Sequence, residues 1–379
     1  MSHRHAFRFR ILRREYCVLI IPLVLLGVGF GQFDGAGPKE TSLVQFVRTF
    51  SSDSDVSGNR TPCQHLRDMV DPSGAVTDVT GERPALCDQV LDIIAGKATP
   101  LPADAVAPIK AAKITVDSRL RVLITEPATR TVHILDFANR KYSHIEGTKG
   151  DRMYIPYGIA VDADDNIYVT DIGRGRIAVY NVNGKFKRYI GKFGNEGAFE
   201  SPQSIAIDRR TGHIYLADTQ RNFVLILDLK GKILAEIGKR GGGGDGPAEF
   251  KQPIEIALYQ NELFVLDKRN DRIQVLDLEG HFIRQFKLEG SGARDANGMA
   301  FDMEGRLFVP ALSWIEVFNR QGERLFRFGQ SGDQPGEFKI PKWICTDIKD
   351  RVYITDSGNQ RIQVFQITNH SKSPVETSE

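Results

Sequence analysis

The sequence predicts an all-β protein: a propeller of six blades, each with four antiparallel strands. A thirteen-residue phrase occurs twice, as YVTDIGRGRIAVY at 168–180 and YITDSGNQRIQVF at 353–365. Related phrases recur in six copies, at intervals of 43 to 51 residues. Each copy has room for four short strands, and such units repeated six times are typical of propeller blades. A solenoid is the alternative, but four-stranded units are large for one.

The three inner strands of each copy are short and rich in β-branched and aromatic residues. The first strands are KITVD (113–117), GIAVD (158–162), SIAID (204–208), EIALY (255–259), GMAFD (298–302) and WICTD (343–347). A more polar fourth strand follows in most copies, as in GKFKRYIG at 184–191. Five first strands end in an Asp that can cap a hairpin turn, namely Asp117, Asp162, Asp208, Asp302 and Asp347.

The repeated pattern P-x-x-IA-x-D … IYVTD-x-G-x-x-RI-x-VF resembles the NHL repeat, and ITDSGNQRIQVF is a close match to it. The resemblance covers about residues 89–366 and implies a six-bladed propeller, in agreement with the copy number. Copies one and five depart from the pattern. Copy one has Glu126 in place of the second Asp, and copy five has Pro310-Ala311 there and Trp314 in place of the usual Arg.

Closure of the ring needs a fourth strand for the last blade. QVLDIIAGK at 89–97 resembles GKILAEIGK at 231–239, so we expect residues 89–97 to close the ring and remove an exposed sheet edge. A short helix is the alternative, because Leu86, Val90, Leu91 and Ile94 have helical spacing and Pro84 suits a first turn. Residues 32–88 are expected to be a linker, and residues 367–379 a disordered tail.

The N-terminus has the pattern of an export signal. Five arginines and one glutamate lie within residues 1–31, around the apolar run VLIIPLVLLGVGF at 18–30. This run is shorter than the roughly 20 apolar residues of a spanning helix. We therefore expect a periplasmic or secreted protein with a cleaved signal, or a membrane-anchored protein if the signal is retained.

The cysteines suit that location. Cys63 and Cys87 lie outside the signal and the repeats, and export permits a disulfide between them, although they can equally remain unpaired. Cys345 lies in an apolar strand and is expected to pack as a small hydrophobic residue.

The candidate ligand site is the mouth of the central channel with the loops around it. The first strands line the channel in such a propeller, and a concave site with a few polar groups is where a ligand binds. The candidate residues are Tyr157, Gln203, Glu255, Asn297, Trp314, Lys342 and Trp343.

Catalysis has weaker support than binding. A metal-dependent lactonase or amidating-lyase propeller needs several convergent ligands, and only Glu255 and Asn297 qualify at the mouth. His133, His144, His213 and His281 fall in different blades and layers, and none is in a first strand. We therefore expect no cofactor; calcium or zinc is the ion to consider if the channel holds one.

Three Asp/Arg pairs are spaced five residues apart: Asp171/Arg176, Asp267/Arg272 and Asp356/Arg361. Because they recur in several blades, we interpret them as turn caps and local ion pairs rather than as a binding ring. We expect no nucleic-acid partner, since the basic loop residues are interleaved with acids and export separates the protein from RNA.

These observations predict an exported, non-catalytic binding or scaffold propeller that recognises a protein or another extracytoplasmic ligand on its loop face. The alternative is a divalent-metal-dependent lyase or lactonase that uses the channel.

Overall fold

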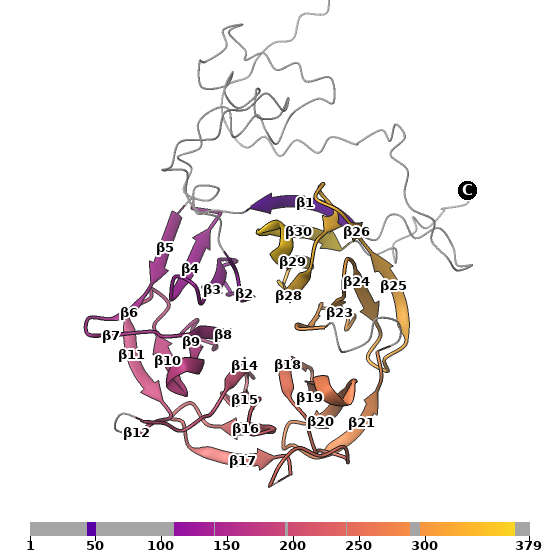
Figure 1. The fold of residues 1–379 in the computed structure, drawn as a ribbon. Coiled ribbons are helices and arrows are strands. Elements are labelled where there is room, and N and C mark those ends of the chain that lie inside the picture. Colours follow the sequence, from indigo (N-terminus) through magenta and orange to yellow (C-terminus); the bar gives the residue numbers. More distant parts are fainter. Residues whose placement is uncertain are drawn as a thin grey trace, which may run out of the picture. The chain divides into compact units, whose positions relative to one another are not determined.

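The computed structural model describes residues 44–50 and 110–367, apart from 140, 194–195, 240 and 289–295. This part of the chain is a ring of six sheets, each of four antiparallel strands (Figure 1). The predicted fold class is therefore confirmed. Within these ranges no helix is long and apolar enough to cross a membrane. The predicted signal at 1–31, Cys63 and Cys87 lie outside the described residues. So does the predicted tail at 367–379 except for Ile367, which is the last residue of β30 and not part of a tail.

Blades 1 to 5 run outward from the channel in chain order, and blade 6 does so except for its outermost strand. Blade 1 contains β2 (Lys113–Val116), β3 (Val122–Glu126), β4 (Thr131–Asp136) and β5 (Lys141–Ile145). Blade 2 contains β8 (Pro156–Val161), β9 (Ile167–Asp171), β10 (Arg176–Tyr180) and β11 (Phe186–Ile190). Blade 3 contains β14 (Pro202–Ile207), β15 (Ile214–Asp218), β16 (Phe223–Leu227) and β17 (Ile233–Ile237).

The second half of the ring repeats this order. Blade 4 contains β18 (Pro253–Tyr259), β19 (Glu262–Asp267), β20 (Arg272–Asp277) and β21 (Phe282–Phe286). Blade 5 contains β22 (Ala300–Phe301), β23 (Leu307–Pro310), β24 (Ile315–Phe318) and β25 (Arg324–Phe328). Blade 6 contains β28 (Pro341–Thr346), β29 (Arg351–Asp356), β30 (Arg361–Ile367) and β1 (Val44–Phe50).

Short elements join these strands. Three two-residue pairs lie in the connections between blades: β6 (Gly147–Thr148) with β7 (Asp151–Arg152), β12 (Lys192–Phe193) with β13 (Glu196–Gly197), and β26 (Gln330–Ser331) with β27 (Glu337–Phe338). Single 3₁₀ turns follow the second strands of blades 2, 4 and 6: η1 (Ile172–Arg174), η2 (Lys268–Asn270) and η3 (Ser357–Asn359).

The ring is closed by β1, which pairs antiparallel with β30 as the outermost strand of blade 6 (Figure 1). Val44 and Phe46 pack on the apolar layer between blades 5 and 6, and the Phe46 ring meets the Phe365 ring at 5.6 Å, edge to face. The fourth strand of blade 6 is therefore β1, and the prediction that residues 89–97 form this strand is wrong. Residues 89–97 lie outside the described residues, and β1 comes from the stretch predicted to be a linker.

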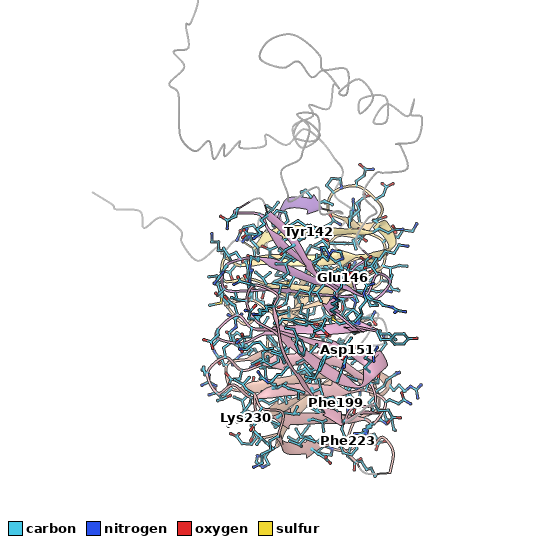
Figure 2. The ribbon with its side chains drawn as sticks, turned by 90° about the vertical axis from the view of Figure 1, so that its left-hand side faces the viewer. Tyr142, Glu146, Asp151, Phe199, Phe223 and Lys230 are labelled. Atoms are coloured by element: carbon cyan, nitrogen blue, oxygen red, sulfur yellow. The ribbon has the colours of Figure 1, made fainter. Side chains whose placement is uncertain are left out.

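The hydrophobic core lies between neighbouring blades rather than at the centre of the ring. Leu123 and Ile134 of blade 1, for example, pack with Ile159 and Val169 of blade 2. Figure 2 shows the ring from the side, with Tyr142 of blade 1 near one end of the view, and Phe199 and then Phe223 of blade 3 towards the other end. Cys345 is buried in the layer between blades 6 and 1, as predicted.

The aspartates that end the first strands cap the turns that follow, as predicted. Asp162 Oδ1 accepts hydrogen bonds from the backbone N–H groups of Asp164 (3.0 Å) and Asn166 (2.8 Å). Asp302 accepts the corresponding bonds from Glu304 and Arg306. The Asx side chain thus accepts hydrogen bonds from backbone N–H groups of its own turn.

The aspartates that end the second strands have a different role from the predicted turn cap. Asp267 Oδ1 accepts the backbone N–H of Lys251 (2.7 Å), in the loop that enters the same blade, while Oδ2 accepts Arg272 Nε (2.9 Å). Asp356 repeats both contacts with Lys339 and Arg361. The local Asp/Arg ion pairs are thus confirmed. Each Asp fixes an incoming loop through the backbone of that loop, and it contacts its own 3₁₀ turn only through the side chain of the Asn that ends the turn.

Replacement of Phe46 by Ala should lower the free energy of unfolding by about 2–4 kcal/mol, because it removes the aromatic contact that holds the closing strand on blade 6. Chemical denaturation followed by circular dichroism measures the change. Val47→Ala is the matched control: Val47 is 45% exposed on the same strand, so its loss should change stability by less than about 0.5 kcal/mol. Equal effects of the two variants would contradict this account of ring closure.

Candidate functional site

One aligned position in each copy lies in the first three residues of the first strand or, in blade 5, two residues before it. In chain order these equivalent positions, here called the channel ring, are Lys113, Gly158, Ser204, Glu255, Gly298 and Trp343. The first strands contact one another around the channel, β2 with β8, then β14, β18, β22, β28 and back to β2. The ring therefore collects residues that are far apart in the sequence.

Threonines of the second strands hold the channel ring in place. Thr125 Oγ1 accepts the backbone N–H of Lys113 (3.0 Å) and donates to the carbonyl oxygen of Tyr157 in the next blade (2.6 Å). Thr170 and Thr355 likewise accept the N–H groups of Gly158 and Trp343. The threonine that precedes the repeated Asp thus fixes the backbone from which the channel side chains project.

The two glycines of the ring lie where neighbouring backbone comes close. A Cβ at Gly158 would stand 2.9 Å from the carbonyl oxygen of Gln203, and one at Gly298 would stand 2.9 Å from that of Lys342. Side chains are therefore excluded at both positions by contact. This leaves four side chains, from blades 1, 3, 4 and 6, to occupy the ring.

These four side chains form one cluster around an ion pair that crosses the channel. Lys113 Nζ of blade 1 contacts Glu255 Oε2 of blade 4, which lies three blades away in either direction around the ring. Ser204 lies between them: its Oγ is 3.3 Å from Lys113 Nζ and 3.2 Å from Glu255 Oε1, and it accepts the backbone N–H of Ile256 (3.1 Å). Only 8% and 10% of the Lys113 and Glu255 side chains are exposed.

Two aromatic rings border the cluster. Lys113 Nζ lies 4.4 Å from the centroid of the Trp343 ring, a cation–π contact, and Tyr157 meets Trp343 edge to face at 5.6 Å. Burial lowers the pKa of the Lys113 ammonium, while the carboxylate, hydroxyl and indole face around it favour the charged form. Burial also raises the pKa of the Tyr157 phenol to about 12, so this group is a proton donor at neutral pH.

The structure brings three of the predicted site residues, Glu255, Trp343 and Tyr157, into this cluster. Gln203 and Lys342 are half-buried and lie one residue before Ser204 and Trp343 on their strands. Asn297, one residue before Gly298, accepts a hydrogen bond from Lys268 Nζ (2.8 Å). These three residues form the rim of the cluster.

Trp314 lies away from the channel cluster. Its indole Nε1 is 3.4 Å from Glu316 on β24, and the Arg327 guanidinium of the outermost strand β25 lies 5.1 Å from its ring. Its contacts are thus with the outer half of blade 5, and it does not take part in the channel mouth.

The channel cluster does not fit a metal ion. In the part of the chain that the structure describes, no three His, Cys, Asp or Glu side chains converge as ligands would. The one carboxylate of the channel ring, Glu255, is paired with the Lys113 ammonium group, which occupies the position beside the carboxylate that a metal ion would need. Calcium and zinc are held by several oxygen, nitrogen or sulfur ligands, and this ring supplies one carboxylate and one hydroxyl.

Blade 1 replaces the Asp/Arg arrangement with a chain of hydrogen bonds. Glu126 accepts the backbone N–H of Lys110 (2.7 Å) and the Thr129 hydroxyl (2.8 Å), and its Oε2 lies 2.9 Å from His133 Nε2. His133 Nδ1 lies 3.0 Å from the Tyr142 hydroxyl. Burial alone would raise the pKa of Glu126, but the hydrogen bonds from His133, Lys110 and Thr129 outweigh it and leave this pKa lowered.

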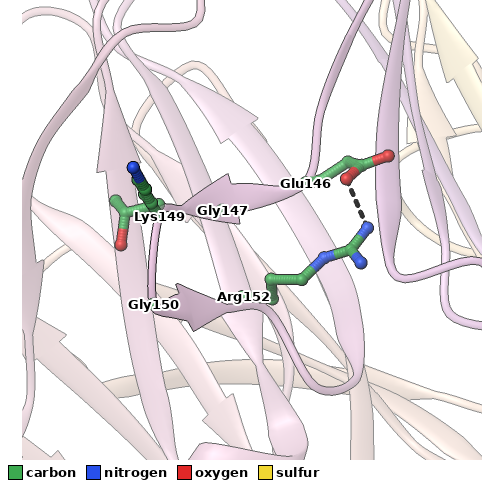
Figure 3. A pocket seen from close by; sticks show the side chains of 6 residues that line it. Glu146, Gly147, Lys149, Gly150 and Arg152 are labelled. Atoms are coloured by element: carbon green, nitrogen blue, oxygen red, sulfur yellow. Dashed lines mark hydrogen bonds and ion pairs between the residues drawn. The ribbon is translucent and has the colours of Figure 1, made fainter.

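A surface hollow of about 310 Å³ lies elsewhere, on the β6–β7 hairpin at the outer side of the ring (Figure 1). It is lined by Glu146, Gly147, Thr148, Lys149, Gly150 and Arg152. Glu146 and Arg152 form an ion pair on one side of the hairpin, and Lys149 lies at its turn (Figure 3). Because Glu146 and Arg152 are paired with each other and the hollow is open to solvent, it offers less convergent chemistry than the channel cluster.

Lys113 and Ser204 are the site residues that sequence reasoning missed. The repeat alignment could have identified them, because they are the first residues of the aligned stretches KITVD and SIAID. Most of the predicted site residues instead precede a channel-ring position by one residue, and these lie on the rim. Only the ring geometry shows that Lys113 reaches the opposite blade.

Comparison with known proteins supports the fold and connects it to lyases. A family profile described as a 6-bladed beta-propeller matches residues 156–238 and 207–305. The chain is 28% identical over 117 residues to a probable peptidyl-alpha-hydroxyglycine alpha-amidating lyase of Caenorhabditis elegans; the match covers 29% of this chain and 32% of the nematode protein. It is 24% identical over 136 residues to the peptidylglycine alpha-amidating monooxygenase of Rattus norvegicus, covering 34% and 14%. The matches thus span a third or less of these relatives.

Two solved structures with the same fold are named as lyases. Virginiamycin B lyase from Staphylococcus aureus superposes with a TM-score of 0.51 at 18% identity, covering 71% of this chain and 83% of that one. A streptogramin B lyase superposes with a TM-score of 0.51 at 15% identity, covering 72% and 82%. At this identity the likeness establishes the propeller fold and nothing further.

Replacement of Lys113 by Met should destabilise the protein by about 3–5 kcal/mol, because it leaves the buried Glu255 carboxylate without its counter-charge. Glu255→Gln in the same chain should restore part of this loss, since both charges are then gone. Denaturant unfolding of the two single variants and the double variant measures the coupling.

The exposed Arg152–Glu146 pair provides the control for this cycle. Arg152→Met should change stability by no more than about 1 kcal/mol, because exposed ion pairs contribute little. Additive effects at Lys113 and Glu255 would show that the cross-channel pair contributes nothing.

Wild-type protein should lose stability relative to Glu126→Gln as the pH falls below about 5. The pKa of Glu126 lies below its ordinary value of 4.5 in the folded protein, so its carboxylate contributes stability above that pH. This contribution is lost as the pH falls through the lowered folded-state pKa. Urea unfolding at a series of pH values measures the difference, and parallel curves for the two proteins would contradict it.

Proposed function

We propose that the protein is a lyase-type enzyme that acts at the mouth of its central channel, on an N-acyl-α-hydroxyglycine such as the C-terminus of a modified peptide. The observation that carries the proposal is the buried cluster of Lys113, Glu255 and Ser204 under the Trp343 and Tyr157 rings. Similarity to amidating lyases supports the substrate class. These findings favour the second of the two functions predicted from the sequence, with a cluster that uses an ammonium group in place of a metal.

Each group of the cluster has a role in this proposal. Glu255 is the general base, because it is the carboxylate of the channel ring. The Lys113 ammonium stabilises negative charge on the substrate in a site from which water is largely excluded. Tyr157 remains protonated at neutral pH and donates a hydrogen bond, while Ser204 holds both charged groups in position.

The reaction balances without a further reactant. The hydroxyl proton of the α-hydroxyglycine passes to the Glu255 carboxylate, and the oxygen electron pair forms a carbonyl group. The bond between this carbon and the amide nitrogen breaks, and the nitrogen takes the proton back from Glu255. The products are a primary amide and glyoxylate, and Glu255 is again ionised.

Purified protein should convert N-benzoyl-α-hydroxyglycine to benzamide and glyoxylate, measured by liquid chromatography. Glu255→Gln should lower kcat/KM by about 10²–10⁴-fold, which is the usual contribution of a general base. Glu262→Gln is the matched control, because Glu262 belongs to the same blade but pairs with Arg284 on the outer strand β21. Absence of turnover by the wild type, or equal losses in both variants, would refute the proposal.

Binding of a protein partner is a second candidate function, favoured by apolar side chains on the loop face. Tyr154, Leu312 and Ile340 are 48%, 54% and 55% exposed. Tyr154 and Ile340 precede the first strands of blades 2 and 6, and Leu312 lies between β23 and β24, so all three belong to the face on which the channel ring opens. An extracytoplasmic partner, and the exported location with or without a membrane anchor, are part of this second proposal.

Replacement of Leu312 and Ile340 by Asp should abolish capture of a partner from an extracytoplasmic fraction if this surface binds one. Because both side chains are exposed, the change should leave the unfolding midpoint nearly unaltered. Met303→Asp is the control, since Met303 is 64% exposed in the turn between the first two strands of blade 5, on the opposite face. Unchanged capture by the Leu312/Ile340 variant would exclude this surface.

A further inference from the structure

We propose that the channel cluster selects ligands that carry a carboxylate, and that this carboxylate replaces Glu255 as the partner of Lys113, so that binding takes up a proton. The inference deepens the proposed lyase function, on which it rests for the choice of ligand. It assigns Lys113 as the residue that recognises the substrate and Glu255 as the group that is displaced.

The first step is the inventory of charge around the pair. The channel ring supplies one cation, Lys113 from β2, and one anion, Glu255 from β18. The other first strands supply uncharged residues at this level, which are Gly158, Ser204, Gly298 and Trp343. The ionisable groups one residue outward are Tyr157 on β8 and Lys342 on β28, with Lys268 of η2 bound to the rim residue Asn297. A ligand anion that reaches this level therefore has one ammonium partner at the ring.

The second step is the state of the Lys113 ammonium. Its three neighbours are the Glu255 carboxylate, the Ser204 hydroxyl and the Trp343 ring face. An ammonium group has three donors, so each neighbour occupies one of them. Of the three, the carboxylate is the one that another carboxylate can replace without loss of charge compensation for Lys113. The hydroxyl and the ring remain to orient the ammonium.

The third step is access. The pair lies at the start of the first strands, directly beneath the half-buried rim residues Tyr157, Gln203, Asn297 and Lys342. Lys342 adds a positive charge at the entrance, which favours the approach of an anion. Tyr157 is half-buried and offers an apolar surface for the rest of an acylglycine, while the buried Trp343 ring supports it edge to face.

The fourth step is the proton. A second carboxylate beside Lys113 places two negative charges next to one ammonium group, in a site with little exposure to water. Two carboxylates that share such a site do not both remain ionised, because like charges at short distance raise the pKa of one of them. Glu255 has lost its ammonium partner and takes the proton. With an unreactive ligand the proton comes from solvent, and with an α-hydroxyglycine it comes from the hydroxyl group that is to be deprotonated.

The experiment compares N-benzoylglycine with its neutral amide, N-benzoylglycinamide, by titration calorimetry of the full chain. The two probes have the same shape, and neither can be cleaved because both lack the hydroxyl group. The carboxylate should bind at least about tenfold more tightly than the amide, because it forms a charge-assisted contact. Its binding, measured in buffers of different ionisation enthalpy, should take up close to one proton and weaken up to about tenfold per pH unit above neutrality.

The variants separate the two roles within the pair. Glu255→Gln should tighten binding of N-benzoylglycine by at least about tenfold and remove the proton uptake, because Lys113 then has no competing anion. A gain in affinity cannot result from misfolding. Lys113→Met should abolish the preference for the carboxylate. Trp343→Phe should retain binding, but it should reduce the change in tryptophan fluorescence that accompanies binding.

Equal affinity for the two probes, binding without proton uptake, or weaker binding by Glu255→Gln would overturn the inference. Its failure is distinct from failure of the lyase proposal. A protein that shows proton-linked carboxylate binding but no cleavage of N-benzoyl-α-hydroxyglycine would retain the inference and refute the lyase. A protein that cleaves this substrate without proton-linked binding would do the reverse.

Discussion

Pairing of β1 with β30 is the constraint on which the rest of the structure depends. Blade 6 takes three strands from the end of the described chain and one from its beginning, so the ring is closed by hydrogen bonds between its two ends. Closure also covers the outer edge of β30, which would otherwise be open to pairing with another chain. Because the layers between neighbouring blades form the core, β1 also contributes Val44 and Phe46 to one of them, the layer between blades 5 and 6.

Closure also creates the site. Lys113 and Glu255 are 142 residues apart in the sequence and belong to opposite blades. They meet because the six first strands are brought to one level, where threonines such as Thr125 and Thr170 fix the backbone. Glycine at 158 and 298 follows from the close approach of neighbouring strands and keeps side chains out of these two positions. The cluster is therefore a product of the ring as a whole rather than of any one blade.

A buried ion pair of this kind is costly to desolvate, and well-packed apolar residues often stabilise a protein as much. Its position at the channel mouth, with a bridging hydroxyl and two aromatic rings, is better explained by function than by stability. The blades likewise contain residues that serve the fold and residues that the fold does not require. The Asp/Arg pairs of blades 4 and 6 hold incoming loops and recur because each blade needs such a tie. Lys113, Ser204 and Glu255 each occur once, and the need to form a blade does not account for them.

The sequence by itself determined the fold class, the number of blades and the order of the three inner strands in each blade. These follow from local features, namely β-branched strands, Asx turns and a regular repeat, which each blade repeats independently of the others. The closing strand could not be found in this way. Any apolar β-prone segment near the N-terminus satisfies the local pattern, and only packing on Phe365 and pairing with β30 select residues 44–50 over residues 89–97. The site was partly accessible: alignment placed Glu255, Trp343 and Tyr157 at the channel mouth. That Lys113 spans the channel, and that Trp314 turns toward the outer strand, depends on side-chain directions and distances across the ring, which only the tertiary structure decides.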